Sequence, residues 1–315
     1  MTWLLLILLC LAAIVLAPLL REALRKTMGS EARALAPGEF ASLSRGVTHY
    51  RWIGPRRGPV AVCVHGLTTP SFVWGDQSHG LATGLADRGF RVLCYDLYGR
   101  GFSDRPVGLQ DRIFFVDQLQ ELLDHQDVRG DFVLIGYSMG GAIATAYASA
   151  HPDRVRELVL LAAAGLKTNP GRLATFIRSQ RPLGDWLMMA LYPRLHIRGT
   201  EAERNLPSSV PNIVDLQQAE LTYKGFVPAV LSSLRGILNE DMGPDLRHIH
   251  RQGVPILAIW GEADDVVPVS SVGRLTEQAR SARQEVIRDA GHGLPYTHTK
   301  EVLAILDANH RRGLE

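Results

Sequence analysis

A serine between two glycines is the strongest chemical signal in this sequence. Residues 136–140 read Gly-Tyr-Ser-Met-Gly, directly after the apolar run 132–135 and directly before the alanine-rich segment 140–151. The run predicts a strand and the segment a helix, so Ser138 stands at a strand-to-helix turn. Glycines let such a turn be sharp enough to expose the serine hydroxyl above the sheet, where a base can activate it. An ordinary Gly/Ser turn is the alternative, and the context favours Ser138 as a nucleophile.

A carboxylate that could orient a catalytic imidazole follows a later strand. Asp264 lies in the segment Gly-Glu-Ala-Asp-Asp, just after the apolar run 255–260. A carboxylate at that place can hold a histidine ring in one tautomer and stabilise its protonated form. Its neighbours Glu262 and Asp265 are alternatives for the same role.

The predicted base is His292. It lies between two glycines just after the last predicted strand, 285–288. The order Ser138, Asp264, His292 along the chain is one of the orders known for catalytic triads.

The loop after strand 60–64 predicts the electrophilic part of the same site. An acyl-transfer reaction develops a negatively charged oxygen, and backbone N–H groups must point at it. The loop His65-Gly66-Leu67 is placed to supply one donor, from Leu67, and Met139, next to the nucleophile, supplies the other. His65 itself is predicted to be structural.

Composition and the remaining motifs argue against other kinds of site. The 34 basic and 32 acidic residues leave a formal charge of only +2, so no nucleic-acid partner is expected. His248 and His250 lack a further ligand signature nearby, and no metal is expected. The loop Gly99-Arg100-Gly101 lacks the pattern of a phosphate-binding loop, and no cofactor is expected.

Strand and helix signals alternate along most of the chain. Continuous β-branched runs between helices indicate a mostly parallel sheet covered on both faces, an α/β fold. The predicted strands are 47–53, 60–64, 91–95, 132–136, 158–162, 255–260 and 285–288, and the predicted helices are 81–88, 113–125, 140–151, 272–283 and 300–310.

Residues 166–247 break this alternation and predict an inserted helical cap. The fold is then a core in two parts, 46–165 and 248–315. Within the cap, the run from Trp186 to Tyr192 is strongly apolar. We predict that Trp186 and Met189 line an entrance for acyl chains, the alternative being the buried face of a cap helix.

The N-terminus predicts a membrane anchor. Residues 3–20 carry no charge and, as a helix, reach about 27 Å, close to the thickness of a bilayer core. We therefore assign residues 1–20 to a transmembrane helix and residues 21–45 to a juxtamembrane linker. Basic residues follow the span and none precedes it, which favours a single-pass membrane protein with a cytoplasmic catalytic domain. A cleaved signal peptide, which would leave a secreted or periplasmic protein, is the alternative.

Taken together, these motifs resemble the α/β-hydrolase fold family with a cap domain. The pieces that carry the resemblance span residues 60–310 and are His65-Gly66, 96–103, 136–141, 261–268 and 291–293. The resemblance implies Ser138 as nucleophile, His292 as general base, Asp264 as its orienter, and Leu67 and Met139 as oxyanion donors. The anchor and short cap are similar to those of membrane-bound monoacylglycerol lipases of this fold.

The expected activity is hydrolysis of carboxylic esters, with a lipid or monoacylglycerol-like substrate of medium or long acyl chain. Relatives of this fold that use an aspartate nucleophile are set aside, because Ser138 occupies that place. A carbon–carbon bond hydrolase, a cofactor-free haloperoxidase-like enzyme, and a catalytically silent scaffold or receptor stay open as alternatives, because one scaffold hosts many chemistries.

Overall fold

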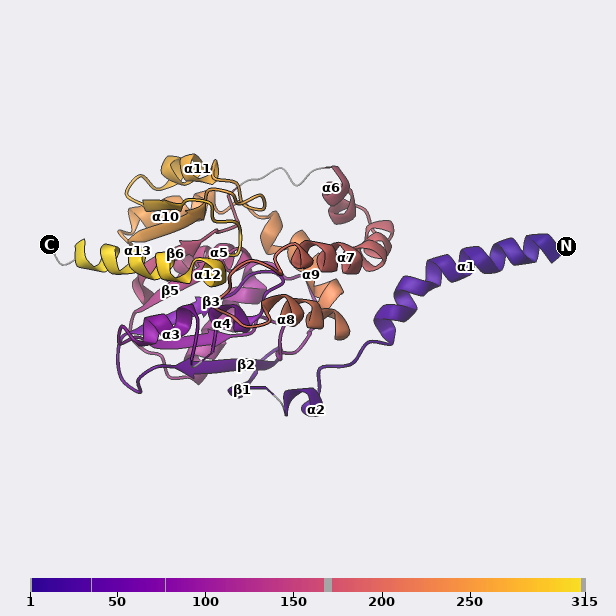
Figure 1. Ribbon diagram of the computed structural model, residues 1–315, viewed down its shortest axis with the longest axis horizontal. Coiled ribbons are helices and arrows are strands. Elements are labelled where there is room, and N and C mark those ends of the chain that lie inside the picture. The colour runs from indigo at the N-terminus through magenta and orange to yellow at the C-terminus, as the bar shows by residue number, and fades with distance from the viewer. Residues whose placement is uncertain (1, 35, 77, 167–171, 313–315) are drawn as a thin grey trace.

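The computed structural model of the chain describes residues 2–34, 36–76, 78–166 and 172–312. These residues form an eight-stranded sheet with helices on both faces, and one long helix projects from the body (Figure 1). The strands are β1 (Glu39–Leu43), β2 (Gly46–Ile53), β3 (Val60–Val64), β4 (Arg91–Tyr95), β5 (Phe132–Tyr137), β6 (Val155–Leu161), β7 (Ile256–Gly261) and β8 (Arg283–Ile287). The helices are α1 (Thr2–Ala23), α2 (Ser30–Arg33), α3 (Leu81–Ala86), α4 (Arg112–His125), α5 (Met139–Ala150), α6 (Arg172–Ser179), α7 (Leu183–Glu201), α8 (Ile213–Ala219), α9 (Phe226–Arg235), α10 (Gly243–Arg251), α11 (Ser271–Gln278), α12 (Leu294–Thr297) and α13 (Thr299–Arg312).

The sheet is mostly parallel, as predicted. Its strand order is β1-β2-β4-β3-β5-β6-β7-β8. Strand β2 pairs antiparallel with both β1 and β4, and every pair from β4 to β8 is parallel. In a parallel sheet the carboxyl ends of the strands meet at one edge, so the loops after β3, β5, β7 and β8 come together there.

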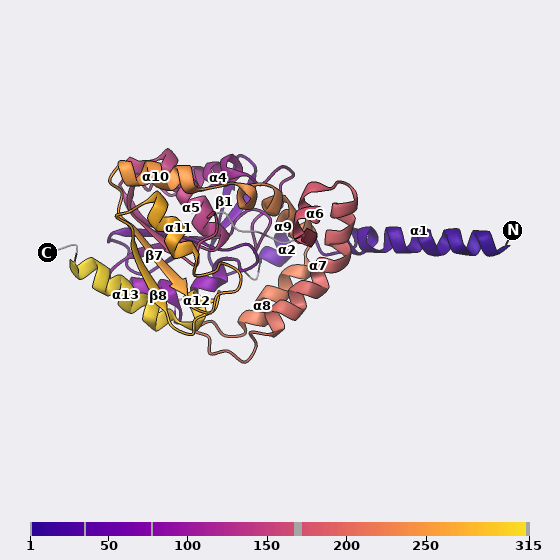
Figure 2. The same cartoon turned by 90° about the horizontal axis from the view of Figure 1, so that it is seen from above.

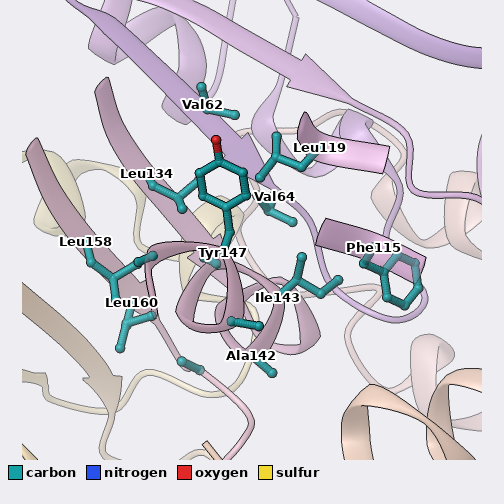
Figure 3. Packing of buried hydrophobic residues seen from close by; sticks show 14 of the residues in the cluster. Val62, Val64, Phe115, Leu119, Leu134, Ala142, Ile143, Tyr147, Leu158 and Leu160 are labelled. Atoms are coloured by element: carbon teal, nitrogen blue, oxygen red, sulfur yellow. The ribbon is translucent and has the colours of Figure 1, made fainter. Parts of the chain in front are cut away.

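The central strands are apolar throughout because both of their faces are buried. In β5, Phe132 and Leu134 belong to one hydrophobic cluster with α4, α5 and α10. The alternate residues Val133 and Ile135 belong to a second cluster with α3, α12 and α13. Figure 3 shows Tyr147 of α5 packed against Leu134 in the first cluster. Each fully buried side chain of this size contributes about 1.5–3 kcal/mol.

A helical cap lies over the carboxyl edge of the sheet, between β6 and β7 in the chain. Helices α6, α7 and α9 pack together through Ile177, Met188, Phe226 and Val230. Helix α10 behaves differently, because its Leu246 and Ile249 pack into the core cluster instead. The boundary expected at residues 247 and 248 therefore falls inside a helix of the core.

Two further segments differ from the sequence-based expectation. Residues 21–45, assigned to a linker, contain β1, whose Ala41 is fully buried and lies opposite Thr48 of β2. The helix expected over 272–283 ends at Gln278, and Arg283 pairs with Leu257 as the first residue of β8.

Helix α1 is long and apolar enough to cross a membrane. An 18-residue window in it has a mean hydropathy of 2.9 and none of its residues is buried. No other helix in the described part of the chain meets both conditions.

Candidate active site

Ser138 lies at a tight turn between β5 and α5. Its backbone has φ 53° and ψ −119°, a conformation that L-residues rarely adopt. The turn is held because the Ser138 amide donates to the Leu161 carbonyl at 3.0 Å and the Ser138 carbonyl accepts from the Ala164 amide at 2.9 Å. A Cβ on Gly140 would lie 2.0 Å from the Val64 carbonyl oxygen, so only glycine lets α5 approach β3 this closely.

The three residues predicted from separate loops form one hydrogen-bonded chain. His292 Nε2 lies 2.8 Å from Ser138 Oγ, and His292 Nδ1 lies 2.8 Å from Asp264 Oδ2. Because a carboxylate can only accept, Nδ1 carries the hydrogen and Nε2 accepts from the serine hydroxyl. The arrangement can therefore withdraw the serine proton and stabilise the imidazolium that results.

Asp264 is held in place by backbone amides. Its Oδ1 accepts from the amides of Val266 and Val267, both at 2.8 Å, and the residue is only 6% exposed. The neighbouring Asp265 is exposed, and the Glu262 carboxylate accepts from the Asp289 amide instead. Of the three acidic residues in this loop, Asp264 is the one that contacts His292.

The predicted oxyanion donors lie on the two loops that meet at Ser138. Met139 is the first residue of α5, where backbone N–H groups have no intrahelical acceptor. Leu67 lines the cavity beside Ser138. A Cβ on Gly66, the residue before Leu67, would lie 3.3 Å from the Ser138 Cβ, which shows how closely the two loops approach.

His65 holds the start of this loop. Its Nδ1–H donates to the Gly66 carbonyl at 2.7 Å, and its Nε2 accepts from the Leu97 amide at 2.9 Å. Burial lowers the pKa of His65 to about 4, so the ring stays neutral and keeps both contacts. The geometry is that of a structural histidine.

Arg100 is a functional candidate that the sequence analysis missed. Its Nε donates to the Leu67 carbonyl at 2.9 Å, and the guanidinium also donates to Gln110 Oε1 at 2.6 Å and to Ser233 Oγ of α9 at 2.8 Å. The side chain is completely buried, and burial lowers its pKa to about 9. Arg100 therefore joins the cap to the loop that carries Leu67. The motif at 99–101 was visible in the sequence, but its contacts are not.

A cavity of about 1510 Å³ lies above the serine, between the core and the cap. It is lined in part by apolar side chains and in part by polar ones. The apolar residues include Leu67, Leu109, Leu166, Leu234, Leu238, Val266 and Val267. The polar residues include Thr175, Arg178, Ser179, Arg181, Tyr192, His196, Glu203, Arg235 and Arg274. The cavity can hold an apolar chain together with a polar group.

The predicted entrance residues do not line this cavity. The Trp186 indole donates to the Val15 carbonyl of α1 at 2.9 Å, and Met189 packs between the cap helices. Tyr192 and His196 of the same helix do line it. Trp186 lies six residues before Tyr192, about 120° short of two full turns, and so points to another side of α7. The apolar run correctly indicated a helix that lines the cavity, but Trp186 and Met189 lie on sides of α7 that do not face the cavity.

Among the residues that the structure describes, no group of three or more histidine, cysteine, aspartate or glutamate side chains is arranged to hold a metal ion.

Comparison with known proteins gives consistent matches. The family model described as alpha/beta hydrolase fold matches residues 59–299. A 2-hydroxy-6-oxononadienedioate/2-hydroxy-6-oxononatrienedioate hydrolase of Cupriavidus pinatubonensis is 29% identical over 252 residues, which are 76% of this chain and 82% of that protein. A pimeloyl acyl-carrier protein methyl ester esterase of Aeromonas hydrophila is 26% identical over 264 residues, 80% of this chain and 95% of that protein. The solved structure of a membrane phospholipase A covers 98% of this chain and 97% of its own, with a TM-score of 0.67 and 20% identity, a likeness of fold.

The contacts of Asp264 generate a prediction about serine reactivity. We expect Asp264→Asn to slow the labelling of Ser138 by a fluorophosphonate by at least about two orders of magnitude, because the imidazole loses its tautomer lock and its charge partner. Asp265→Asn and Glu262→Gln are matched controls and should stay within about threefold of the wild-type rate. If Asp265→Asn is labelled slowly and Asp264→Asn at the wild-type rate, Asp265 is the residue that orients His292.

The contacts of Arg100 generate a second prediction. Arg100→Lys keeps the charge but cannot make the forked contacts, and we expect it to lower the free energy of unfolding by about 3 kcal/mol. It should also weaken binding of a trifluoromethyl ketone, whose adduct carries the oxyanion, by about tenfold. Ser233→Ala, which removes one contact, should change both less. Urea unfolding measures the first effect and inhibition constants measure the second. Unchanged ketone binding in Arg100→Lys would show that Arg100 does not position the loop that carries Leu67.

Proposed function

The chain belongs to the alpha/beta hydrolase fold family, and we propose that it is a membrane-anchored serine hydrolase that cleaves carboxylic esters of lipid-like molecules. The observation that carries the proposal is the hydrogen-bonded chain from Ser138 through His292 to Asp264. This order of groups activates a serine for attack on a carbonyl carbon.

The reaction proceeds in two halves through an acyl-enzyme. Ser138 Oγ attacks the ester carbonyl carbon while His292 Nε2 takes the hydroxyl proton. The carbonyl oxygen becomes negative and is stabilised by the N–H groups of Leu67 and Met139. The tetrahedral intermediate then collapses, and His292 gives its proton to the departing alcohol. Water repeats the sequence on the acyl-enzyme, releases the carboxylic acid and restores Ser138.

The cavity supports a substrate with an acyl chain of medium or long length. Its apolar wall, which includes Leu166, Leu234 and Leu238, lies in the same cavity as Ser138. A wall of this kind favours each buried methylene by about 0.8 kcal/mol. The relative named as a methyl ester esterase supports ester chemistry on this scaffold.

Helix α1 supports attachment to a membrane. Its apolar stretch from Trp3 to Leu20 is exposed along its length, which suits a lipid environment and not water. Arg21, Arg25 and Lys26 follow it, and they favour a cytoplasmic position for the catalytic domain.

Substitution of the nucleophile tests the proposal. We expect Ser138→Ala to lower kcat for p-nitrophenyl esters and monoacylglycerols by several orders of magnitude, because the Ser138 hydroxyl is the group that donates to His292 Nε2. Ser179→Ala is the matched control, since Ser179 lines the same cavity without contacting His292. Ester hydrolysis that survives in Ser138→Ala would contradict the proposed mechanism, and a wild type that hydrolyses none of these esters would contradict the proposed activity.

Acyl-chain preference tests the assignment of the substrate. We expect kcat/KM to rise steadily from acetyl to octanoyl esters, by up to about fourfold for each methylene that becomes buried. Leu238→Ala should flatten the rise, whereas Leu216→Ala, on the outer surface of α8, should not. An enzyme that prefers acetyl esters would exclude a lipid-like substrate.

A further inference from the structure

Helix α1 is packed against the cap and is not a free tether. The Trp186 indole N–H of α7 donates to the Val15 carbonyl of α1 at 2.9 Å. At the end of α1, the Glu22 carboxylate accepts from the Gly225 amide at 2.7 Å. Both views of the molecule show α6 and α7 at the end of the body from which α1 projects (Figures 1 and 2). The membrane position of α1 therefore determines that of the cap.

The contact at Val15 places part of the cap at a defined depth. The apolar stretch of α1 continues to Leu20, and Arg21 is the first charged residue after it. Val15 lies five residues before Leu20, so it is about 7 Å deeper in the bilayer, measured along the helix axis. If Leu20 marks the edge of the hydrocarbon, the Trp186 indole nitrogen that contacts Val15 lies about 7 Å inside that edge. Indole rings with one polar atom concentrate at this level of a bilayer.

The exposed side chains of α6 and of the first half of α7 have the composition of an interfacial element. Leu173 and Phe176 of α6 are 56% and 40% exposed, and Leu183 and Leu191 of α7 are 53% and 37% exposed. Arg172 and Arg181 are exposed in the same segment. The one acidic residue between 172 and 191, Asp185, is paired with Arg235 of α9, so its charge is compensated.

We propose that residues 172–191, here named the α6–α7 edge, lie in the head-group layer of the phospholipid bilayer that α1 crosses. The inference rests on the proposed anchoring by α1. Exposed leucines and Phe176 enter the boundary between head groups and acyl chains, and the arginines meet the phosphates. Amphipathic helices bound in this way are buried by about 5–10 Å, which matches the depth given by Val15.

The α6–α7 edge also forms part of the cavity wall. Thr175, Arg178, Ser179 and Arg181 belong to the α6–α7 edge and also line the cavity above Ser138. A cavity wall that lies in the head-group layer gives the site access to esters that are already in the bilayer. The substrate class is then a membrane-resident lipid ester rather than an ester dissolved in water.

Spin labels on the full chain in phosphatidylcholine–phosphatidylglycerol vesicles test the depth. The background is Cys10→Ala, because Cys63 and Cys94 are buried and cannot be labelled. Nitroxides at Leu183→Cys and Leu191→Cys should be more accessible to oxygen than to an aqueous nickel chelate. Val286→Cys on β8, where the native residue is 45% exposed, is the control and should show the reverse.

The outcomes separate this inference from the proposed anchoring. In one outcome, the protein stays with the vesicles in alkaline carbonate, but both test labels behave like the label at Val286. This result would contradict only the placement of the α6–α7 edge in the head-group layer. Protein that leaves the vesicles would overturn the anchoring and the edge together. Neither result depends on catalysis, so ester hydrolysis is tested independently.

A charge at the edge gives a second readout. Leu183→Asp should lower the hydrolysis of a vesicle-borne monoacylglycerol, relative to that of soluble p-nitrophenyl butyrate, by about fivefold or more, because a carboxylate is unfavourable at this depth. Leu216→Asp on α8 introduces the same charge away from the edge and should leave the ratio unchanged. An unchanged ratio in Leu183→Asp would contradict the inference.

Discussion

The arrangement of the site depends on the strained turn at Ser138. Residues held in such backbone conformations cost about 1–3 kcal/mol and persist only where the surroundings fix them. Here the Ser138 amide donates a hydrogen bond to β6, and the Ser138 carbonyl accepts one from the loop after β6. Gly140 allows α5 to lie against the end of β3. The same turn aims Oγ at His292 and opens α5 with the N–H of Met139. A residue larger than glycine at 140 would move all of these groups together.

Much of the fold and the site could be predicted because the relevant signals are local. Ser138 and Asp264 each follow an apolar run and His292 follows the last predicted strand, and parallel strands bring such positions to one edge. Arg100 gave no comparable signal. Its role depends on acceptors at Leu67 and Ser233, far away in the sequence, and no pattern along the chain reveals that a charged side chain is buried among them.

The cap was predicted less well, for a physical reason. An apolar run of seven residues has no polar position to show which side of the helix faces the protein, so Trp186 and Met189 were assigned to the cavity. In the structure, Tyr192 lines the cavity, whereas the Trp186 indole donates a hydrogen bond to α1. Helix α1 and the cap helices are far apart in the sequence. Their packing could therefore not be predicted from either segment alone. That packing joins α1 to the helix whose Tyr192 and His196 line the cavity.

Observation of the covalent acyl-enzyme tests most directly whether Ser138 is the nucleophile. The wild-type protein is quenched in acid during hydrolysis of p-nitrophenyl octanoate, digested and analysed by mass spectrometry. We expect the peptide containing Ser138 to gain the mass of one octanoyl group, since the acyl-enzyme forms on that hydroxyl. Turnover of the ester with the octanoyl group on a different residue would contradict it.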